Sequence, residues 1–133
     1  MNAVQSVAQK ATKMVTVLVV EDAPSEMKLM SHYLQAEGFS VIGAITGKEG
    51  LEKAIAQQPD VIVTDVVMPG ISGFELCRKL KNTPENKEVT DVICTSKGQT
   101  IDRMWGMRQG AKAYLIKPYT RAQLVEAVKT ALT

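Results

Sequence analysis

The sequence predicts an α/β fold, a single domain in which a parallel β-sheet is covered by helices on both faces. Short apolar runs rich in β-branched residues alternate along the chain with segments of helical periodicity. These runs are almost continuously apolar, which is typical of parallel strands buried on both faces. At 133 residues the chain can bury one such core but is too short for a second folded domain beside it.

Five strands are predicted, because five short apolar segments are each bounded by turn-forming or polar residues. They are Thr16 to Val20, Ser40 to Ala44, Val61 to Thr64, Val92 to Thr95 and Ala113 to Ile116. Residues 1–14 lie outside this pattern and are predicted to form an N-terminal tail, with the domain proper spanning 15–133. Helical spacing of apolar residues inside the tail leaves a short helix as the alternative to a frayed segment.

Five helices are predicted between and after the strands. The first stops at Gly38, the second spans Lys48 to Gln57, the third starts near Gly73, the fourth runs from about Ile101 to Gln109, and the last spans Arg121 to Leu132. The residues expected to face the core are Met27, Met30 and Leu34 in the first helix, Leu51, Ala54 and Ile55 in the second, Phe74, Leu76, Cys77 and Leu80 in the third, and Leu124, Val125, Val128 and Leu132 in the last.

Charge and composition exclude several classes of function. Lys10 and Lys13 lie in the acid-free tail, which leaves 14 basic residues against 14 acidic ones in the rest of the chain. This neutral body gives no sign of direct nucleic-acid binding. The first apolar run, Val15 to Val20, is too short to insert into a membrane or to serve as a signal peptide, so a cytoplasmic location is expected. Cys77 and Cys94 lack metal-ligand spacing and are interpreted as buried thiols rather than a disulfide.

Charged residues follow three of the predicted strands. Glu21 and Asp22 come after the first strand, Asp65 after the third and Lys117 after the last. If these strands are parallel neighbours, the residues meet at the carboxyl edge of the sheet, where open α/β folds bind their ligands. Asp22 also has a plainer interpretation as the cap of the following helix. Lys117 could likewise be a solvated strand end, and Thr95 a β-branched strand residue.

Together these residues resemble the receiver domain of two-component response regulators, of the stand-alone chemotaxis or twitching-motility type. The resemblance rests on Val19-Val20-Glu21-Asp22, on Asp65 with Met68-Pro69-Gly70-Ile71-Ser72-Gly73, on Thr95-Ser96-Lys97 and on Lys117-Pro118-Tyr119. It spans Val15 to Leu132. It implies a doubly wound, flavodoxin-like (βα)5 fold with strand order 2-1-3-4-5.

The same resemblance implies a Mg²⁺ site. Asp22 and Asp65 would bind the metal directly, Glu21 through a water molecule, and the backbone carbonyl of Val67 would be a further ligand. Chemistry agrees with this independently, because a carboxylate that accepts a phosphoryl group needs positive charge to approach an anionic phosphate. Mg²⁺ prefers oxygen ligands and is held by one or two carboxylates plus phosphate oxygens.

The remaining site residues follow from the resemblance as well. Asp65 would be the phosphoacceptor, Lys117 would contact a phosphoryl oxygen, and Thr95 would donate its hydroxyl to another. Tyr114 matches the aromatic switch position and would turn inward when Thr95 moves; the alternative is a tyrosine packed on the sheet edge. Lys117-Pro118 would be a cis peptide, whose isomer the sequence alone does not fix.

The implied partners are a histidine kinase or phosphotransfer protein as donor and a downstream protein target. Met104, Trp105 and Tyr114 could form the surface that the target binds, although Met and Trp at helical spacing also fill cores. His32 is expected to be an exposed helix residue rather than a phosphodonor. The protein is expected to be a monomer.

Three functions compete on the sequence. The favoured one is a phosphoacceptor signalling domain with intrinsic autodephosphorylation rather than an enzyme. An aspartyl-nucleophile phosphatase of the haloacid dehalogenase type needs a second Asp two residues after the nucleophile, where this chain has Val67. The third is the receiver part of a larger DNA-binding regulator. The resemblance also implies that Val67 and Lys97 flank the path of the water that hydrolyses the acyl phosphate. Because Val67 cannot hydrogen-bond a water, slow autodephosphorylation is predicted.

Overall fold

The computed structural model describes residues 14–96, 107–108 and 110–133. Its five parallel strands form one sheet in the order β2-β1-β3-β4-β5. The strands are β1 (Thr16–Val20), β2 (Ser40–Ala44), β3 (Val61–Thr64), β4 (Thr90–Thr95) and β5 (Ala111–Ile116). This arrangement confirms the predicted fold class and strand order.

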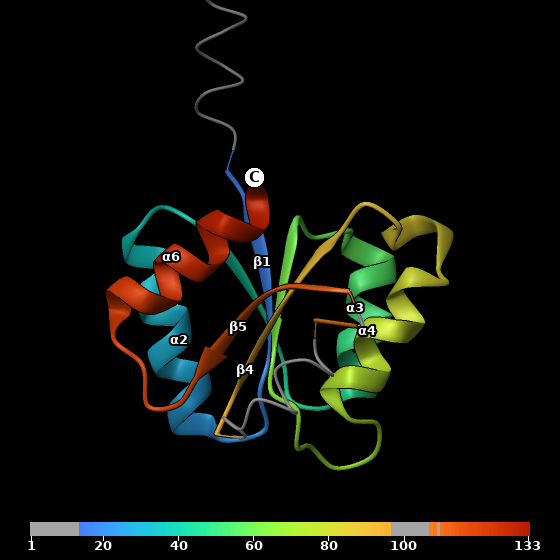
Figure 1. Ribbon diagram of the computed structural model, residues 1–133, viewed down its shortest axis with the longest axis horizontal. Helices are drawn as coiled ribbons and strands as arrows, with labels where there is room; N and C mark the ends of the chain where they lie inside the picture. The colour runs from blue at the N-terminus through green and yellow to red at the C-terminus, as the bar shows by residue number, and fades with distance from the viewer. Residues whose placement is uncertain (1–13, 97–106, 109) are drawn as a thin grey trace, which may run out of the picture.

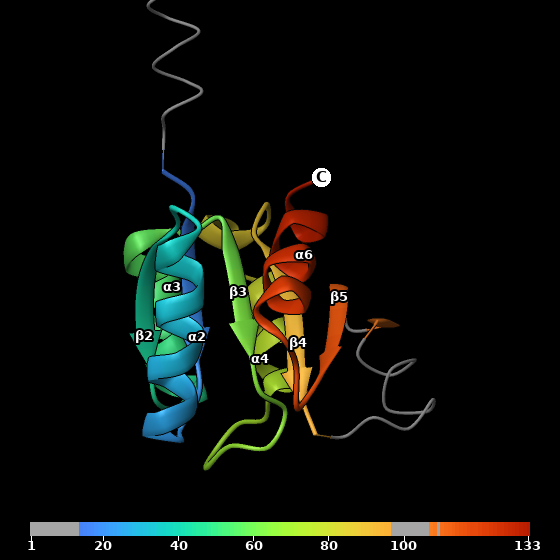
Figure 2. The same cartoon turned by 90° about the vertical axis from the view of Figure 1, so that its left-hand side faces the viewer.

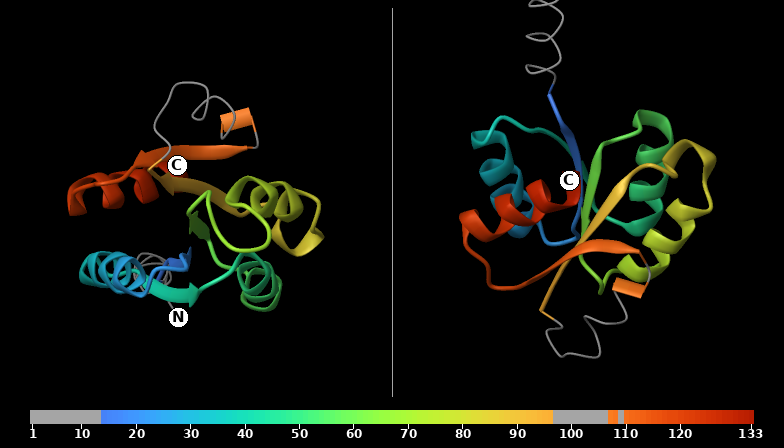
Figure 3. Two further views of the ribbon diagram at one scale, coloured as in Figure 1. Left: turned by 90° about the horizontal axis from the view of Figure 1, so that it is seen from below. Right: turned by 45° about the horizontal axis from the view of Figure 1, so that its top comes forward.

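Helices cover both faces of the sheet. They are α2 (Pro24–Ala36), α3 (Gly47–Gln57), α4 (Gly73–Lys81) and α6 (Arg121–Leu132), with a short 3-10 turn, η1 (Pro84–Asn86), after α4. Figure 1 shows α2 and α6 on one side of the sheet and α3 and α4 on the other. The same two pairs appear when the domain is viewed from below, in the left panel of Figure 3. The carboxyl ends of the strands all point the same way, downward in Figure 2.

Two apolar layers hold the helices against the sheet. In β1, Val17 and Val19 face the layer under α2 and α6, whereas Leu18 and Val20 face the layer under α3 and α4. All four side chains are at most 1% exposed. Because side chains alternate across a strand, a strand covered on both faces needs apolar residues at every position. This requirement explains the uninterrupted apolar run of β1.

Two strands begin earlier than predicted. β4 starts at Thr90 rather than Val92, and β5 starts at Ala111 rather than Ala113. The early part of β4 contains Asp91, which is fully buried and pairs in register with Ile62 and Ala111. Charged residues such as Asp91 in β4 and Lys112 in β5 are typical of loops. The sequence pattern therefore missed the first residues of both strands.

Two predicted core residues are exposed instead. Ile55 in α3 and Leu132 in α6 are each 39% exposed, so the prediction that they face inward was wrong. Each follows a buried alanine, Ala54 or Ala131, by one position. One position turns the side chain by about 100° around the helix axis. In α3 the buried residues Gly50 and Ala54 define the inward face and Ile55 lies beside it, whereas Leu132 is the last residue of α6.

Several predictions concern residues outside the described ranges. These are the tail, the site residue Lys97 and the surface residues Met104 and Trp105; of the fourth helix, only Met107 and Arg108 are described. The boundary between the tail and the domain therefore stays a prediction. Among the helices that the structure describes, none is long and apolar enough to cross a membrane.

Candidate functional site

The predicted site residues lie at the carboxyl edge of the sheet, each held by backbone hydrogen bonds just past a strand. The Glu21 amide donates to the carbonyl oxygen of Ala44 (2.9 Å), and the Asp65 amide donates to that of Val20 (3.2 Å). The Lys117 amide donates to the carbonyl oxygen of Thr95 (2.9 Å). The parallel ladder thus continues one residue beyond β1, β3 and β5 and fixes where each charged side chain starts.

Three carboxylates converge at this edge. Glu21, Asp22 and Asp65 each offer an oxygen, and these oxygens all lie within 4.8 Å of one another. Glu21 is buried, Asp65 is partly buried and Asp22 is exposed. The cap of α2 is Ala23, with no side-chain hydrogen bond, so the alternative that Asp22 caps this helix is wrong. The Asp22 carboxylate instead lies close to those of Glu21 and Asp65.

Lys117 reaches across the sheet into this acidic cluster. Its Nζ donates to Glu21 Oε1 at 2.6 Å and to Asp65 Oδ2 at 3.2 Å. It also lies 3.6 Å from Oε2 of Glu26, a residue in the first turn of α2. The peptide bond between Lys117 and Pro118 is cis, as the resemblance implied. Sequence reasoning missed Glu26, which lies on the helix that begins just past Asp22.

The electrostatics of the cluster follow from burial and pairing. Burial raises the pKa of Glu21 above its ordinary value, although the hydrogen bond from Lys117 opposes the shift. Burial alone would lower the pKa of Lys117, but the hydrogen bond to Glu21 and the charge of Asp65 outweigh it, and the pKa stands above its usual value. Lys117 is therefore a fixed positive charge at this edge. Burial also raises the pKa of the nearby Cys94 thiol, to about 12, so that thiol stays neutral.

The loop after Asp65 is tied down at both ends. The Val66 amide donates to Asp65 Oδ1 at 2.7 Å, and the Gly73 amide donates to the Val66 carbonyl oxygen at 2.9 Å. A Cβ at Gly73 would lie 2.1 Å from the carbonyl oxygen of Asp65, so only glycine allows α4 to begin here. Between these anchors the Val67 side chain is 60% exposed. The anchors hold the Asp65 carboxylate while leaving the loop surface open.

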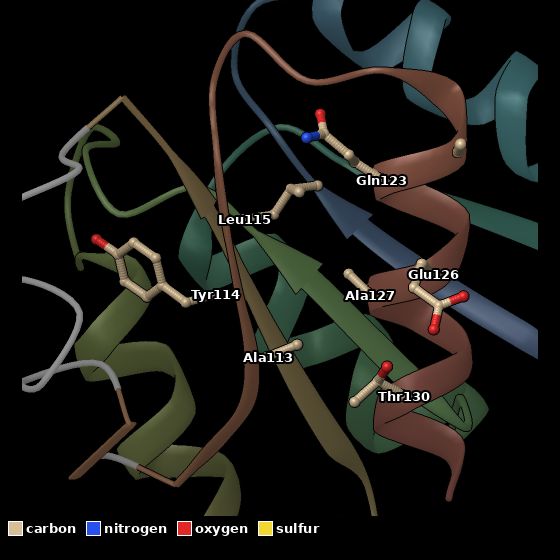
Figure 4. Close-up of a pocket in the computed structure, with 8 residues that line it drawn as sticks. Ala113, Tyr114, Leu115, Gln123, Glu126, Ala127 and Thr130 are labelled. Atoms are coloured by element: carbon tan, nitrogen blue, oxygen red, sulfur yellow. The ribbon is translucent and has the colours of Figure 1, made fainter.

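Thr95 and Tyr114 lie on the two strands next to this loop. Thr95 is buried at the end of β4. Tyr114 lies on β5 opposite Ile93 and packs with Phe74 against a small apolar cluster that includes Val66. Figure 4 shows the tyrosine ring on the side of β5 away from α6. On the α6 side, a groove of about 530 Å³ runs between β5 and α6, with Glu126 and Ala127 in its wall.

The acidic cluster fits a magnesium ion. Octahedral Mg²⁺ with ligand oxygens at about 2.0 to 2.1 Å places opposite oxygens roughly 4 Å apart. The three carboxylate oxygens lie within 4.8 Å of one another, close enough for one ion to reach all three, and they are hard oxygen donors. The backbone carbonyl of Val67 belongs to the adjoining loop, so the predicted ligands come from one small region. The cluster therefore suits Mg²⁺ in both donor type and size.

The fold and this edge are those of a response regulator receiver domain, and the chain belongs to that family, which matches residues 17–129. Protein PilH of Pseudomonas aeruginosa is 37% identical over 119 residues, which cover 90% of this chain and 98% of PilH. The phosphate regulon transcriptional regulatory protein PhoB of Rhizobium meliloti is 34% identical over 116 residues; the match covers 87% of this chain but 51% of PhoB, so this chain spans about half of that length. Among solved structures, the chemotaxis response regulator CheY4 of Vibrio cholerae has a TM-score of 0.85 at 32% identity, covering 90% of this chain and 100% of CheY4.

Proposed function

We propose that this chain is a single-domain response regulator that accepts a phosphoryl group onto Asp65 from a histidine kinase or a phosphotransfer protein. One observation carries the proposal: the Asp65 carboxylate lies 3.2 Å from the ammonium of Lys117 and within 4.8 Å of an oxygen from each of two further carboxylates, Glu21 and Asp22. This arrangement supplies a nucleophile and positive charge, and a place for a cation. The coverage of nearly all of PilH supports the single-domain form.

The geometry of Asp65 suits attack on phosphorus. Its Oδ1 accepts a hydrogen bond from the Val66 amide, while its Oδ2 faces Lys117. In the proposed step, an oxygen of Asp65 forms a bond to phosphorus as the phosphorus–nitrogen bond of a phosphohistidine breaks, and the histidine nitrogen takes the electron pair. A carboxylate oxygen attacks phosphorus without giving up a proton, so the step requires no general base, and the residues act by position and charge.

Mg²⁺, when bound, supplies the positive charge that lets the anionic donor approach three carboxylates. Asp22 and Asp65 are proposed as direct ligands, with the Val67 carbonyl as another. Glu21 is proposed to act through water, because Lys117 and the Ala23 amide already occupy its Oε1 and Oε2. Lys117 then offsets the charge of the phosphoryl oxygens from the opposite side.

Thr95 and Tyr114 are proposed to transmit the signal. Thr95 shares a backbone hydrogen bond with Lys117, so the two residues that would contact the phosphoryl group are held together. A turn of the Thr95 hydroxyl toward that group would open space for the Tyr114 ring, and the altered surface would be read by a downstream protein. The signal is the difference in free energy between the two arrangements. The protein is proposed to act as a cytoplasmic monomer, in keeping with its two buried free thiols.

A longer regulator is the second candidate, because the chain matches about half of PhoB and the receiver could be one part of such a protein. The length of the native gene would decide between the two forms. The phosphatase alternative has weaker support, since the position that would hold its acid/base carries Val67, an aliphatic side chain.

Phosphorylation with a small donor tests the proposal. Incubation with acetyl phosphate and Mg²⁺ should add one phosphate per chain, and Asp65→Asn should abolish the addition. Asp60→Asn is a matched control: Asp60 borders the opposite end of β3, where its Oδ2 accepts from the Thr16 amide, and an asparagine retains an acceptor oxygen. Full labelling of Asp65→Asn, or loss of labelling in Asp60→Asn alone, would contradict the assignment.

A further inference from the structure

Lys117 has a third carboxylate partner that the proposed phosphoryl chemistry does not use. Besides Glu21 and Asp65, its Nζ lies 3.6 Å from Oε2 of Glu26. Glu26 comes from a different element, the first turn of α2, and its side chain is 38% exposed. In the part of the chain that the structure describes, the metal-type cluster comprises Glu21, Asp22 and Asp65 and does not include Glu26.

The hydrogen bonds of Glu21 show why Lys117 needs another partner. Glu21 Oε1 accepts from Lys117 at 2.6 Å, and Oε2 accepts from the Ala23 amide at 3.2 Å. If Glu21 turns toward a cation or its water shell, its short bond to Lys117 is weakened. A partly buried ammonium that loses an anionic partner pays a desolvation cost. Among the described residues, Glu26 is the carboxylate within ion-pair distance of Lys117 that remains outside the cluster.

We infer that Glu26 is a positioning residue that holds Lys117 while Mg²⁺ occupies the acidic cluster and releases it when the phosphoryl group arrives. The inference rests on the proposed function. In the metal-loaded, unphosphorylated state, the charges of Glu21 and Asp65 are shared with the cation, and Glu26 compensates for their weakened pairing with Lys117. In the phosphorylated state, Glu26 competes with the phosphoryl oxygens for the same ammonium. Glu26 therefore favours the binding of Mg²⁺ and disfavours the binding of the phosphoryl group.

The size of the effect follows from exposure. An ion pair whose acid is more than a third exposed is weakened by solvent, and such pairs typically change an equilibrium by about two- to fivefold. Glu26→Gln should weaken Mg²⁺ binding by this factor, since both remaining carboxylate partners of Lys117, Glu21 and Asp65, then belong to the metal cluster. The same change should strengthen the binding of beryllofluoride, a phosphoryl analogue, by about the same factor at saturating Mg²⁺.

Glu75→Gln is a matched control. Glu75 lies in the first turn of α4, as Glu26 lies in the first turn of α2, and both side chains are 38% exposed. The ion-pair partner of Glu75 is Arg78 at 4.0 Å, not Lys117. Both substitutions therefore remove one negative charge from a helix start with similar exposure. Only Glu26→Gln removes a partner of Lys117.

Calorimetric titration of the full chain with Mg²⁺, and then with beryllofluoride at saturating Mg²⁺, tests the inference. Opposite changes in the two dissociation constants for Glu26→Gln, absent from Glu75→Gln, would support it, and both should shrink at high salt. Changes of the same sign, or changes equal to those of the control, would overturn it. A wild-type protein that binds Mg²⁺ but takes no phosphate from acetyl phosphate would instead reject the proposed function.

Discussion

Replacing Asp91 should make the protein more stable at neutral pH. The Asp91 side chain is fully buried at the start of β4, and neither of its oxygens has a hydrogen-bond partner within the described residues. Lys81 Nζ, on the last residue of α4, lies 3.6 Å away but is itself 37% exposed. Burial therefore dominates, and it raises the pKa of Asp91 from its ordinary 3.8 to about 6 despite the lysine charge.

The size and sign of the effect follow from linkage. A folded-state pKa of about 6 against an ordinary value of 3.8 corresponds to about 3 kcal/mol of lost stability once the carboxyl is ionised. Below about pH 4 the group is protonated in both states and the loss is absent. Between pH 4 and 6 the unfolded chain releases the proton first, so stability falls as pH rises. The full penalty is present at pH 7.

Urea unfolding of wild type and Asp91→Val, followed by circular dichroism from pH 3.5 to 8, measures this. Valine suits a strand, and the exposed part of Lys81 lets its ammonium stay in water. The stability of the variant relative to wild type should rise by about 3 kcal/mol between pH 4 and 7. A difference that stays constant over this range would show that Asp91 does not carry the penalty, whatever the absolute stability of the variant.

Three further predictions concern the site. Asp22→Ala should weaken Mg²⁺ binding strongly in a calorimetric titration, and Glu21→Ala should weaken it less if Glu21 acts through water. If Asp22→Ala bound Mg²⁺ with wild-type affinity, Asp22 would not be a metal ligand. Val67→Asn should speed the release of phosphate after the donor is removed, and a tenfold change corresponds to about 1.4 kcal/mol in the barrier. Val67→Ala controls for the loss of side-chain volume. An unchanged or slower rate in Val67→Asn would show that residue 67 does not control the access of the hydrolytic water. Gly73→Ala should lower the free energy of unfolding by more than about 1 kcal/mol, because its Cβ would lie 2.1 Å from the Asp65 carbonyl oxygen; an unchanged urea midpoint would refute this.

The sequence predicts the fold well because parallel strands covered on both faces leave a strong signal. Val17 to Val20 alternate between two apolar layers, so each of these four positions of β1 had to be apolar. The acidic edge was predictable for a related reason: Glu21, Asp65 and Lys117 each interrupt an apolar run at its carboxyl end, and parallel strands bring those ends together.

Features that depend on tertiary context were not predictable. In the sequence, Asp91 is typical of a loop, because a buried aspartate in a strand is rare. Its partner Lys81 comes from α4, a contact that forms only in the folded structure. In the sequence, Glu26 is an ordinary acid in the first turn of a helix, and its contact with Lys117 joins residues that are far apart along the chain. The exposure of Ile55 could not be predicted either, because the apolar spacing of α3 does not show that Ala54, rather than Ile55, faces the core.

The order in which the chain is made gives the position of Lys117 a further consequence. The lysine lies 96 residues after Glu21 and 52 residues after Asp65, so a ribosome completes every acid of the cluster before it adds the neutralising charge. At about 5 to 20 residues per second, Asp65 waits roughly 3 to 10 seconds for its partner. During that interval the nascent chain carries clustered carboxylates that repel one another, so closing β5 onto β4 both completes the sheet and relieves the repulsion. A nascent chain that has not yet placed β5 thus lacks the positive charge of Lys117 at this edge, and under the proposed function its ability to accept a phosphoryl group would arrive only with the last strand.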